Sequence, residues 1–208
     1  GESDFSFSCR VAELQHQRHG LPLLVATSYL GEHDPDEPEV CLSKGAPVWF
    51  RRSTLRSAGG ALASNLGRLS ELGAQVLYGV DARDLQRSLL GRGTAGHFDA
   101  VAFPFPQASP CADPRNPELL HAFLASASQP GVLAAGGTVQ VLLLAQQYVS
   151  WDVARVATAQ GFELHARGAL PCDFYSPRSL MGERWAPEGA ELFVFGRRSE
   201  SEPGPRRP

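Results

Sequence analysis

The chain has 208 residues, of which 43% are hydrophobic and 20% are charged, and its formal net charge at pH 7 is −3. This length and composition are typical of a single globular domain with enough apolar material for a hydrophobic core. They exclude a transmembrane helix, because the most apolar stretch, 133–145, is interrupted by Gly136, Gly137 and Gln140. They also exclude a polycation, so any binding of nucleic acid would depend on a local basic patch.

The cysteines and histidines predict no metal site. The four cysteines are widely spaced and form no C-x-x-C pair, which argues against a zinc ribbon and against a redox motif. His16 and His19 lie close together, but no cysteine or carboxylate follows them at the spacing of a metal-binding set. We therefore expect free thiols in a reducing compartment.

The chain opens with the segment G-E-S-D-F-S-F-S (1–8), which leads into a helical pattern. Phe7, Val11 and Leu14 recur at the spacing of one helix face, and a serine ahead of them can cap the helix. A glycine, an acid and small hydroxyl side chains at a helix amino terminus predict a cradle for a polar ligand. The alternative is a capped surface helix that binds nothing.

An apolar strand and an irregular segment come next. The strand is predicted over 21–29 and ends in three hydroxyl side chains, Thr27, Ser28 and Tyr29. Segment 40–60 shows no sustained hydrophobic period and combines glycines, serines and a cluster of arginines. We therefore expect an irregular insertion there.

A helix and a second strand follow this insertion. Leucines at helical spacing predict a helix over 61–72 that ends at Gly73. Residues 75–80 are predicted as a strand, and Asp81 or Asp84 can cap the short helical turn that comes after it.

The segment H-F-D-A-V-A-F-P-F-P-Q (97–107) is central to the predicted fold. Its apolar run over 98–103 is continuous, which is typical of a parallel strand that is covered on both faces. The prolines that follow end strand pairing and stiffen the exit loop. Because ligands in open α/β sheets bind beyond the carboxyl ends of strands, the exit loop is a candidate site. A core strand with an ordinary loop is the alternative.

The second half of the chain again alternates helical and strand patterns. Asn116, followed by a proline and an acid, predicts the capped start of a helix, and Ser150 predicts the cap of another. The remaining predicted elements are strands over 138–144, 162–170 and 191–196, and a loop over 171–189.

Strands alternate with helices until a closing pair of strands, which predicts an α/β fold with a mostly parallel, doubly wound sheet. Neither an internal repeat nor a linker divides the chain. We therefore expect a single domain over 1–198, followed by a disordered, polar tail over 199–208.

Taken together, these motifs resemble those of the ribosomal RNA uridine-N3 methyltransferase family, whose domain also occurs joined to a ferredoxin-fold anticodon-binding domain. Segment 1–8 resembles G-E-G-N-F-S-F-S, and F-P-F-P (103–106) resembles F-N-F-P. The resemblance covers residues 1 to about 178, apart from the insertion. Further matching positions, in the expected order, are Ala26 to Tyr29, Gly79 to Ala82, Asn116, Leu119, Leu120, Gly136, Gly137, Tyr148 and Trp151.

The resemblance implies a Rossmann-like methyltransferase fold with a closing antiparallel strand. A strand precedes the glycine loop in that fold, so we expect the first strand to be truncated in this chain. The implied methyl donor is S-adenosylmethionine, and the implied acceptor is N3 of a uridine in large-subunit ribosomal RNA or in another structured RNA. The family also implies a nucleolar or cytoplasmic location, and it specifies neither an oligomeric state nor a membrane partner.

The resemblance also implies the roles of individual residues, although it names no catalytic base. Residues near the methionine end of the cofactor, its ribose and its adenine are Gly1, Glu2, Ser3, Thr27, Ser28, Tyr29, Asp81 and Ala82. Residues that wall the pocket of the acceptor base are Pro104, Phe105, Pro106 and Gln107, with Phe105 as a stacking platform.

Four positions depart from the family pattern. Ser3 replaces a glycine, Asp4 and Pro104 replace asparagines, and Gln107 replaces a histidine. Pro104 in particular lacks the side-chain amide and the backbone N–H of the residue it replaces. These departures support an alternative function, a degenerate methyltransferase-like module that binds RNA or protein without catalysis. A nucleotide-dependent oxidoreductase is disfavoured, because the chain has no G-x-G-x-x-G motif.

Overall fold

The computed structural model describes residues 5–19, 24–27, 39–43, 46–50, 53–89, 92, 97–107, 114–171, 174 and 187–198. The predicted site residues Gly1, Glu2, Ser3, Ser28 and Tyr29 lie outside these described residues, as does the tail over 199–208. No helix within the described ranges is long and apolar enough to cross a membrane.

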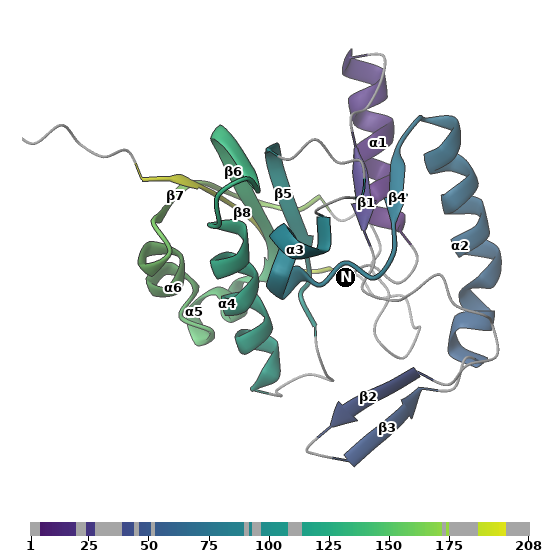
Figure 1. Ribbon diagram of the computed structural model, residues 1–208, viewed down its shortest axis with the longest axis horizontal. Helices are drawn as coiled ribbons and strands as arrows, with labels where there is room; N and C mark the ends of the chain where they lie inside the picture. Colours follow the sequence, from purple (N-terminus) through teal and green to yellow (C-terminus); the bar gives the residue numbers. More distant parts are fainter. Residues whose placement is uncertain are drawn as a thin grey trace, which may run out of the picture.

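Helices and strands alternate along the chain (Figure 1). The elements of the first half are α1 (Ser6–His19), β1 (Val25–Thr27), β2 (Glu39–Ser43), β3 (Ala46–Phe50), α2 (Ser53–Glu71), β4 (Gln75–Leu77), the 3-10 turn η1 (Ala82–Asp84) and α3 (Leu85–Leu89). Those of the second half are β5 (Phe98–Pro104), α4 (Arg115–Ala127), β6 (Leu133–Leu144), α5 (Ala145–Ser150), α6 (Val153–Ala159), β7 (Phe162–Ala169) and β8 (Ala190–Arg197).

The main strands form two sheets. β1 and β4 pair in parallel, with Thr27 opposite Leu77. The larger sheet has the order β5-β6-β8-β7, in which β5 and β6 are parallel and β8 runs antiparallel to both of its neighbours. These pairings confirm the predicted α/β class and the closing antiparallel strand.

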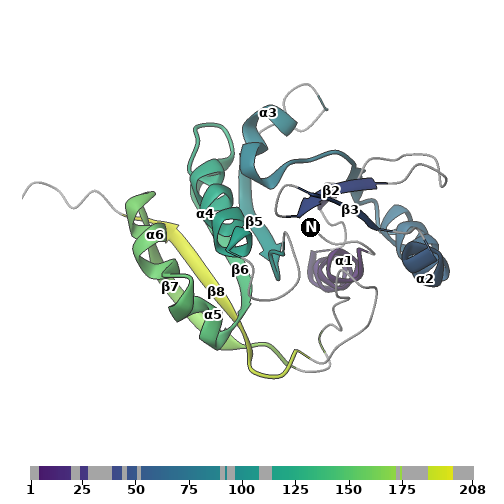
Figure 2. The ribbon, with the colours of Figure 1, turned by 90° about the horizontal axis from the view of Figure 1, so that it is seen from below.

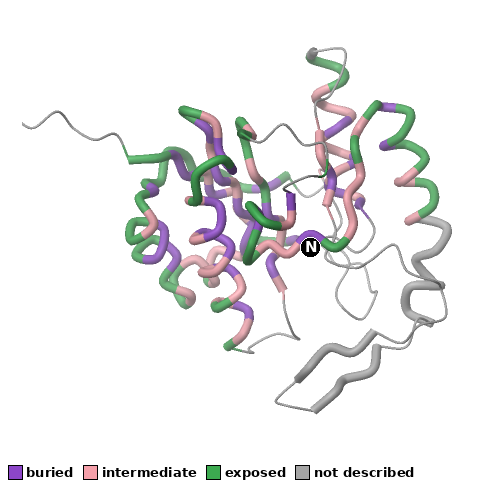
Figure 3. The backbone as a smooth tube through the Cα atoms, in the orientation of Figure 1, coloured by how far each residue is buried: buried purple, intermediate pink, exposed green. Residues whose placement is uncertain are grey.

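Helices cover the larger sheet on one face, where α4, α5 and α6 lie together (Figure 2). Val139, Val141 and Phe193 point to this side and are fully buried against Phe123 of α4 and Val153 of α6. Figure 3 shows the buried residues concentrated between these helices and the strands. This apolar cluster is the largest in the protein's described part and anchors β5.

Helix α1 lies between the two sheets. Phe5, just ahead of the helix, and Cys9 pack into a cluster that includes Ala26 of β1 and Leu69 of α2. Phe7 belongs to a different cluster, in which it packs with Leu142 of β6 on the face opposite to α4. The amino-terminal part of α1 therefore contacts both sheets.

The structure differs from the expectation of an irregular insertion over 40–60. β2 and β3 form an antiparallel hairpin in which Glu39 lies opposite Phe50, and α2 begins at Ser53. Short strands such as E-V-C-L-S and A-P-V-W-F contain too few residues to display a period, although their β-branched and aromatic residues favour a strand.

Two predicted helix caps are also wrong. Pro114 is the cap of α4, and Asn116 lies inside the first turn with 3% of its surface exposed. Ser150 ends α5 instead of starting α6, whose cap is Asp152 in the left-handed conformation. In both cases a neighbouring residue takes the capping position, and helix ends shift by a residue or two at little energetic cost.

Candidate functional site

The carboxyl ends of three strands lie toward the same side of the molecule. β1, β4 and β5 run in the same direction in Figure 1. Consequently Thr27, the pair Asp81–Ala82 and segment 104–107 all lie at or just beyond strand ends, as the sequence predicts. In α/β sheets this edge is where ligands bind.

Asp81 caps the turn that follows β4. Its Oδ1 accepts a hydrogen bond of 2.9 Å from the backbone N–H of Arg83, which defines the cap of η1. The Arg83 guanidinium also donates to both carboxylate oxygens, at 2.9 Å from Nε to Oδ1 and 2.7 Å from Nη2 to Oδ2. These hydrogen bonds from Arg83 lower the pKa of the Asp81 carboxyl, although partial burial opposes the shift. The carboxylate is therefore ionised at neutral pH.

The turn that carries Asp81 is fixed to the hydrophobic core by tertiary contacts. Val80, Leu85 and Leu89 are buried in the large cluster, and Ala82 packs against it. In addition, the Leu85 N–H donates to the buried Ser126 Oγ of α4 at 2.6 Å. The position of Asp81 is therefore set by tertiary contacts as well as by the local turn.

The same turn is linked to the start of α1 through two aromatic rings. Phe5 is 1% exposed, and its ring lies edge-to-face against the ring of Tyr78, with centroids 6.0 Å apart. Phe5 also adopts a positive φ of 56°, which a bulky residue adopts only when its surroundings impose it. Phe5, directly ahead of α1, is thus held beside the segment that leads to Asp81.

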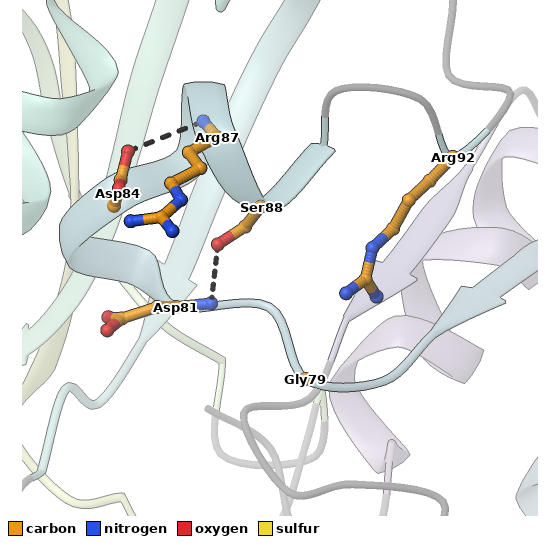
Figure 4. A pocket seen from close by; sticks show the side chains of 6 residues that line it. All are labelled: Gly79, Asp81, Asp84, Arg87, Ser88 and Arg92. Atoms are coloured by element: carbon orange, nitrogen blue, oxygen red, sulfur yellow. Dashed lines mark hydrogen bonds between the residues drawn. The ribbon is translucent and has the colours of Figure 1, made fainter.

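A cavity of about 310 Å³ opens beside Asp81 (Figure 4). Its floor is the β4–α3 connection, where the Asp81 N–H donates to Ser88 Oγ at 3.1 Å. The cavity is lined by Gly79, Asp81, Asp84, Arg87, Ser88 and Arg92. Of the predicted site residues that the structure describes, Asp81 is the one that lines this cavity; Thr27 and segment 104–107 do not.

Segment 104–107 follows β5 at the neighbouring strand end. Pro104 is the last residue of β5, opposite Leu142, and the Phe105 N–H still donates to the Leu142 carbonyl at 3.0 Å. Pro106 is buried, whereas Pro104, Phe105 and Gln107 are half-buried. Strand pairing therefore ends at this point, as the prolines predict.

Phe105 has a positive φ of 46°, so the chain turns sharply directly after the strand. Its ring packs against the cluster of Phe7 and Leu142 and keeps part of its surface accessible. Non-glycine residues in this conformation store strain and are common at functional sites. The geometry is compatible with the predicted stacking role, and it does not test that role.

The arginines around Asp81 were not predicted as site residues. Arg83 engages the carboxylate directly, and Arg87 and Arg92 lie in the wall of the cavity. The only sequence signal for them is the high density of charged residues in D-A-R-D-L-Q-R-S (81–88). A turn followed by a short helix leaves the directions of such side chains undetermined until the tertiary contacts are known.

The described residues offer a carboxylate and a hydroxyl at the position implied for the adenosine part of the cofactor. A carboxylate offers about four acceptor positions, and Arg83 makes four hydrogen bonds to Asp81, from N and Nε to Oδ1 and from Nε and Nη2 to Oδ2. An adenine amino group would therefore take the place of one of the Arg83 hydrogen bonds. Thr27, at the neighbouring strand end, is half-buried and adds a hydroxyl.

Comparison with known proteins places the chain in a family. No curated protein matches it. Among solved structures, the 30S ribosomal A1408 methyltransferase from an uncultured bacterium is similar with a TM-score of 0.46 and 12% identity, covering 95% of this chain and 84% of that one. The 16S rRNA (adenine(1408)-N(1))-methyltransferase from Catenulisporales acidiphilia, as a mutant with its cosubstrate SAM, gives a TM-score of 0.43 and 13% identity, covering 99% and 85%.

The family model described as rRNA (uridine-N3-)-methyltransferase BTM5-like matches residues 50–177. This range runs from the end of β3 to beyond β7 and contains Asp81, Ala82 and all of segment 104–107. It covers more than half of the chain and agrees with the ordered motifs found in the sequence. The chain therefore belongs to the BMT5-like family of rRNA (uridine-N3-) methyltransferases.

Proposed function

We propose that this protein transfers a methyl group from S-adenosylmethionine to N3 of a uridine in large-subunit ribosomal RNA. The observation that carries the proposal is the match of residues 50–177 to the BMT5-like family, within which Asp81 follows a strand end. The family description names a uridine of ribosomal RNA as the methyl acceptor. We infer S-adenosylmethionine as the methyl donor.

In this proposal the loops at the strand ends hold the cofactor. Asp81 would accept a hydrogen bond from the adenine amino group, and Ala82 would face the adenine. Thr27, Ser28 and Tyr29 would hold the ribose, and residues 1–3 would hold the methionine end. An ionised carboxylate suits the first role, since hydrogen bonds that involve a charged group are the stronger ones.

S-adenosylmethionine would supply an electrophilic methyl group for transfer to uracil N3, whose proton would leave to a base or to water. The contribution of the protein is mainly to hold the two partners in line, which can supply much of the rate enhancement. Segment 104–107 would do this for the acceptor, with the base stacked on Phe105.

The departure at Pro104 favours a second candidate function, a non-catalytic module that binds RNA or protein. Pro104 ends β5 and provides neither a backbone N–H nor a side-chain amide to a base beside it. A chain of this kind would retain a surface for RNA while failing to position the reacting atoms.

Calorimetry with S-adenosylmethionine tests the cofactor assignment. The wild-type chain should bind with a Kd on the order of micromolar, and Asp81→Ala should weaken binding by roughly tenfold or more, because it removes a charged acceptor. Asp99→Asn is the matched control, since Asp99 is an exposed acid near the amino end of β5, whereas the candidate site lies at the carboxyl ends of the strands. Equal affinities of all three proteins would refute the role of Asp81.

Methyl transfer to RNA separates the two candidate functions. A single-stranded RNA that contains uridine should accept a labelled methyl group, and the same RNA with cytidine in place of uridine should not. Binding of RNA without measurable heat from S-adenosylmethionine would identify the non-catalytic module. We also propose a nucleolar or cytoplasmic location, which imaging of the tagged protein would test.

A further inference from the structure

We propose that the cavity beside Asp81 binds a phosphodiester group of the RNA strand through Arg87, Ser88 and Arg92. This inference rests on the proposed function, because it gives the substrate RNA a contact away from the reacting base. It assigns a role to side chains that the cofactor model leaves unused.

Arg92 is fixed across the end of β4. Its Nη1 donates to the carbonyl oxygen of Tyr78, and its own carbonyl accepts a 3.3 Å hydrogen bond from Gln75 Nε2. The other N–H groups of this guanidinium have no acceptor among the described residues. Gly79 keeps the space next to them open: it has a φ of +66°, and a Cβ built on it would lie 3.8 Å from Arg92 Nη2.

Arg87 is exposed on α3, and its guanidinium makes no hydrogen bond or ion pair within the described ranges. Ser88, next to it, accepts a hydrogen bond from the Asp81 N–H, so its own O–H can donate. Figure 4 shows Arg87 and Arg92 on opposite sides of Ser88. All three side chains therefore line the same cavity, with the Arg87 guanidinium on the Asp81 and Asp84 side of Ser88 and the Arg92 guanidinium on the other side.

Asp81 and Asp84 contribute two negative charges to the lining of the cavity, and Arg87 and Arg92 contribute two positive charges. Arg83, which does not line the cavity, forms an ion pair with Asp81, so the lining retains one positive charge without a counter-charge. Asp84 uses Oδ1 to accept from the Arg87 backbone N–H at 3.3 Å, and in Figure 4 both carboxylates lie away from Arg92. An acceptor with one negative charge would satisfy the remaining donors.

A phosphodiester has this chemistry. Its non-bridging oxygens accept only, its charge is single, and arginine recognises it well. The volume of about 310 Å³ is roughly ten times the share of one water molecule, about 30 Å³, so a phosphate group and its neighbouring atoms fit. A free inorganic phosphate offers the same acceptors, so the test must separate it from a phosphate within a strand.

The test is the salt dependence of RNA binding. Anisotropy of a labelled single-stranded oligouridylate, measured over a range of salt concentrations, gives both the affinity and the slope of its logarithm against the logarithm of salt concentration. Arg87→Gln should weaken binding roughly three- to tenfold at low salt and reduce the slope by about 0.7, the value for one lost phosphate contact on a single strand. Arg18→Gln is the matched control, because Arg18 is an exposed arginine on α1 that does not line the cavity.

Arg92 provides a second comparison. Arg92→Lys should keep the slope, whereas Arg92→Gln should lower it as Arg87→Gln does. If Arg92→Gln is too unstable to use, Arg87→Gln still decides the matter, since the Arg87 guanidinium makes no hydrogen bond or ion pair with a described residue.

Equal slopes for Arg87→Gln, Arg18→Gln and wild type would overturn the proposal, and so would the absence of RNA binding by wild type. Displacement of ligand by inorganic phosphate with an unchanged oligouridylate slope would reveal a site for free phosphate and would also overturn it. Calorimetry with S-adenosylmethionine on the same variants keeps the two hypotheses apart: a cofactor that does not bind refutes the proposed methyl transfer, whereas the slopes alone decide the phosphate contact.

Discussion

Phe5 and Tyr78 meet edge-to-face, with ring centroids 6.0 Å apart. The contact joins the segment ahead of α1 to the segment between β4 and Asp81, although the two residues are far apart in the sequence. It therefore places the residue directly ahead of α1 next to the segment that leads to Asp81.

Phe5→Ala should destabilise the protein by about 3–5 kcal/mol, because it removes a ring that is 1% exposed and leaves a cavity in the cluster around Leu69. Urea unfolding followed by circular dichroism would measure the change. Val149→Ala is the control: Val149 is 78% exposed, and its truncation should change stability by less than about 0.5 kcal/mol. Similar losses for both variants would contradict the assigned packing.

Ser126→Ala should cost about 1–3 kcal/mol, since it leaves the N–H of the buried Leu85 without its hydrogen-bond partner. Ser70→Ala, at an exposed position of α2, should have a small effect of either sign. Ser126→Ala should also weaken S-adenosylmethionine binding, because the hydrogen bond from the Leu85 N–H to Ser126 Oγ fixes the turn that carries Asp81. Unchanged unfolding midpoints would show that Ser126 does not hold the turn.

Gly137→Ala should destabilise by about 1–3 kcal/mol. A Cβ at this position would lie 2.9 Å from the Phe98 carbonyl oxygen and 3.0 Å from the Ala134 carbonyl oxygen, both of which are backbone atoms. The register shift between β5 and β6 occurs here, so the strands cannot move apart without losing pairing. Gly67→Ala is the contrasting variant: nothing lies within 4 Å of the new methyl group in α2, and it should stabilise by about 0.5–1 kcal/mol.

The ion pair between Asp81 and Arg83 predicts a pH dependence. The pKa of Asp81 is lowered in the folded state, so its contribution to stability is present above the unfolded value of about 3.9 and is lost as the pH falls through the folded value. The contribution is at most about 1 kcal/mol, because Arg83 is half-exposed and solvent screens the pair.

Unfolding of wild type and Asp81→Asn between pH 7 and pH 3 would measure this effect. The difference in stability should be constant down to about pH 5 and should shrink below about pH 4. A difference that grows as the pH falls would mean that the carboxyl group is not stabilised in its ionised form.

Phe105→Leu should weaken RNA binding by about 1–3 kcal/mol if an unstacked base lies on the ring, since leucine fills the space but has no aromatic face. Because leucine can maintain contact with Leu142 and Phe7, the stability should change by less than about 1.5 kcal/mol. Anisotropy with oligouridylate and urea unfolding would separate the two effects. Unchanged RNA affinity and unchanged methyl transfer would exclude Phe105 from the acceptor pocket.

Much of the fold could be predicted from the sequence because its strong signals are local. The continuous apolar run of β5 and the proline that ends it are visible without tertiary information, and Asp81 was predicted as a cap because it directly follows a strand. The caps of α4 and α6 were misplaced, since Pro114 and Asp152 take those positions through backbone conformations that residue type alone does not specify.

The charged residues that line the cavity could not be predicted from local sequence signals. Arg87 and Arg92 lie on either side of Ser88 only because η1 and α3 fold back over the end of β4, and that arrangement depends on Ser126 of α4. Such a dependence on residues distant in the sequence is invisible to spacing and periodicity. Asp81, which directly follows a predicted strand, could therefore be predicted as a site residue, whereas Arg87 and Arg92 could not.

The separation of the strands into two sheets has a mechanical consequence. Asp81 is carried by the pair β1–β4 and Phe105 by the sheet that contains β5, and no backbone hydrogen bond between described strands joins the two. Helix α1, wedged between them, is packed against both by side chains alone. Among the described residues, the relative position of the two strand ends therefore depends on side-chain packing around α1 rather than on a shared ladder of backbone hydrogen bonds.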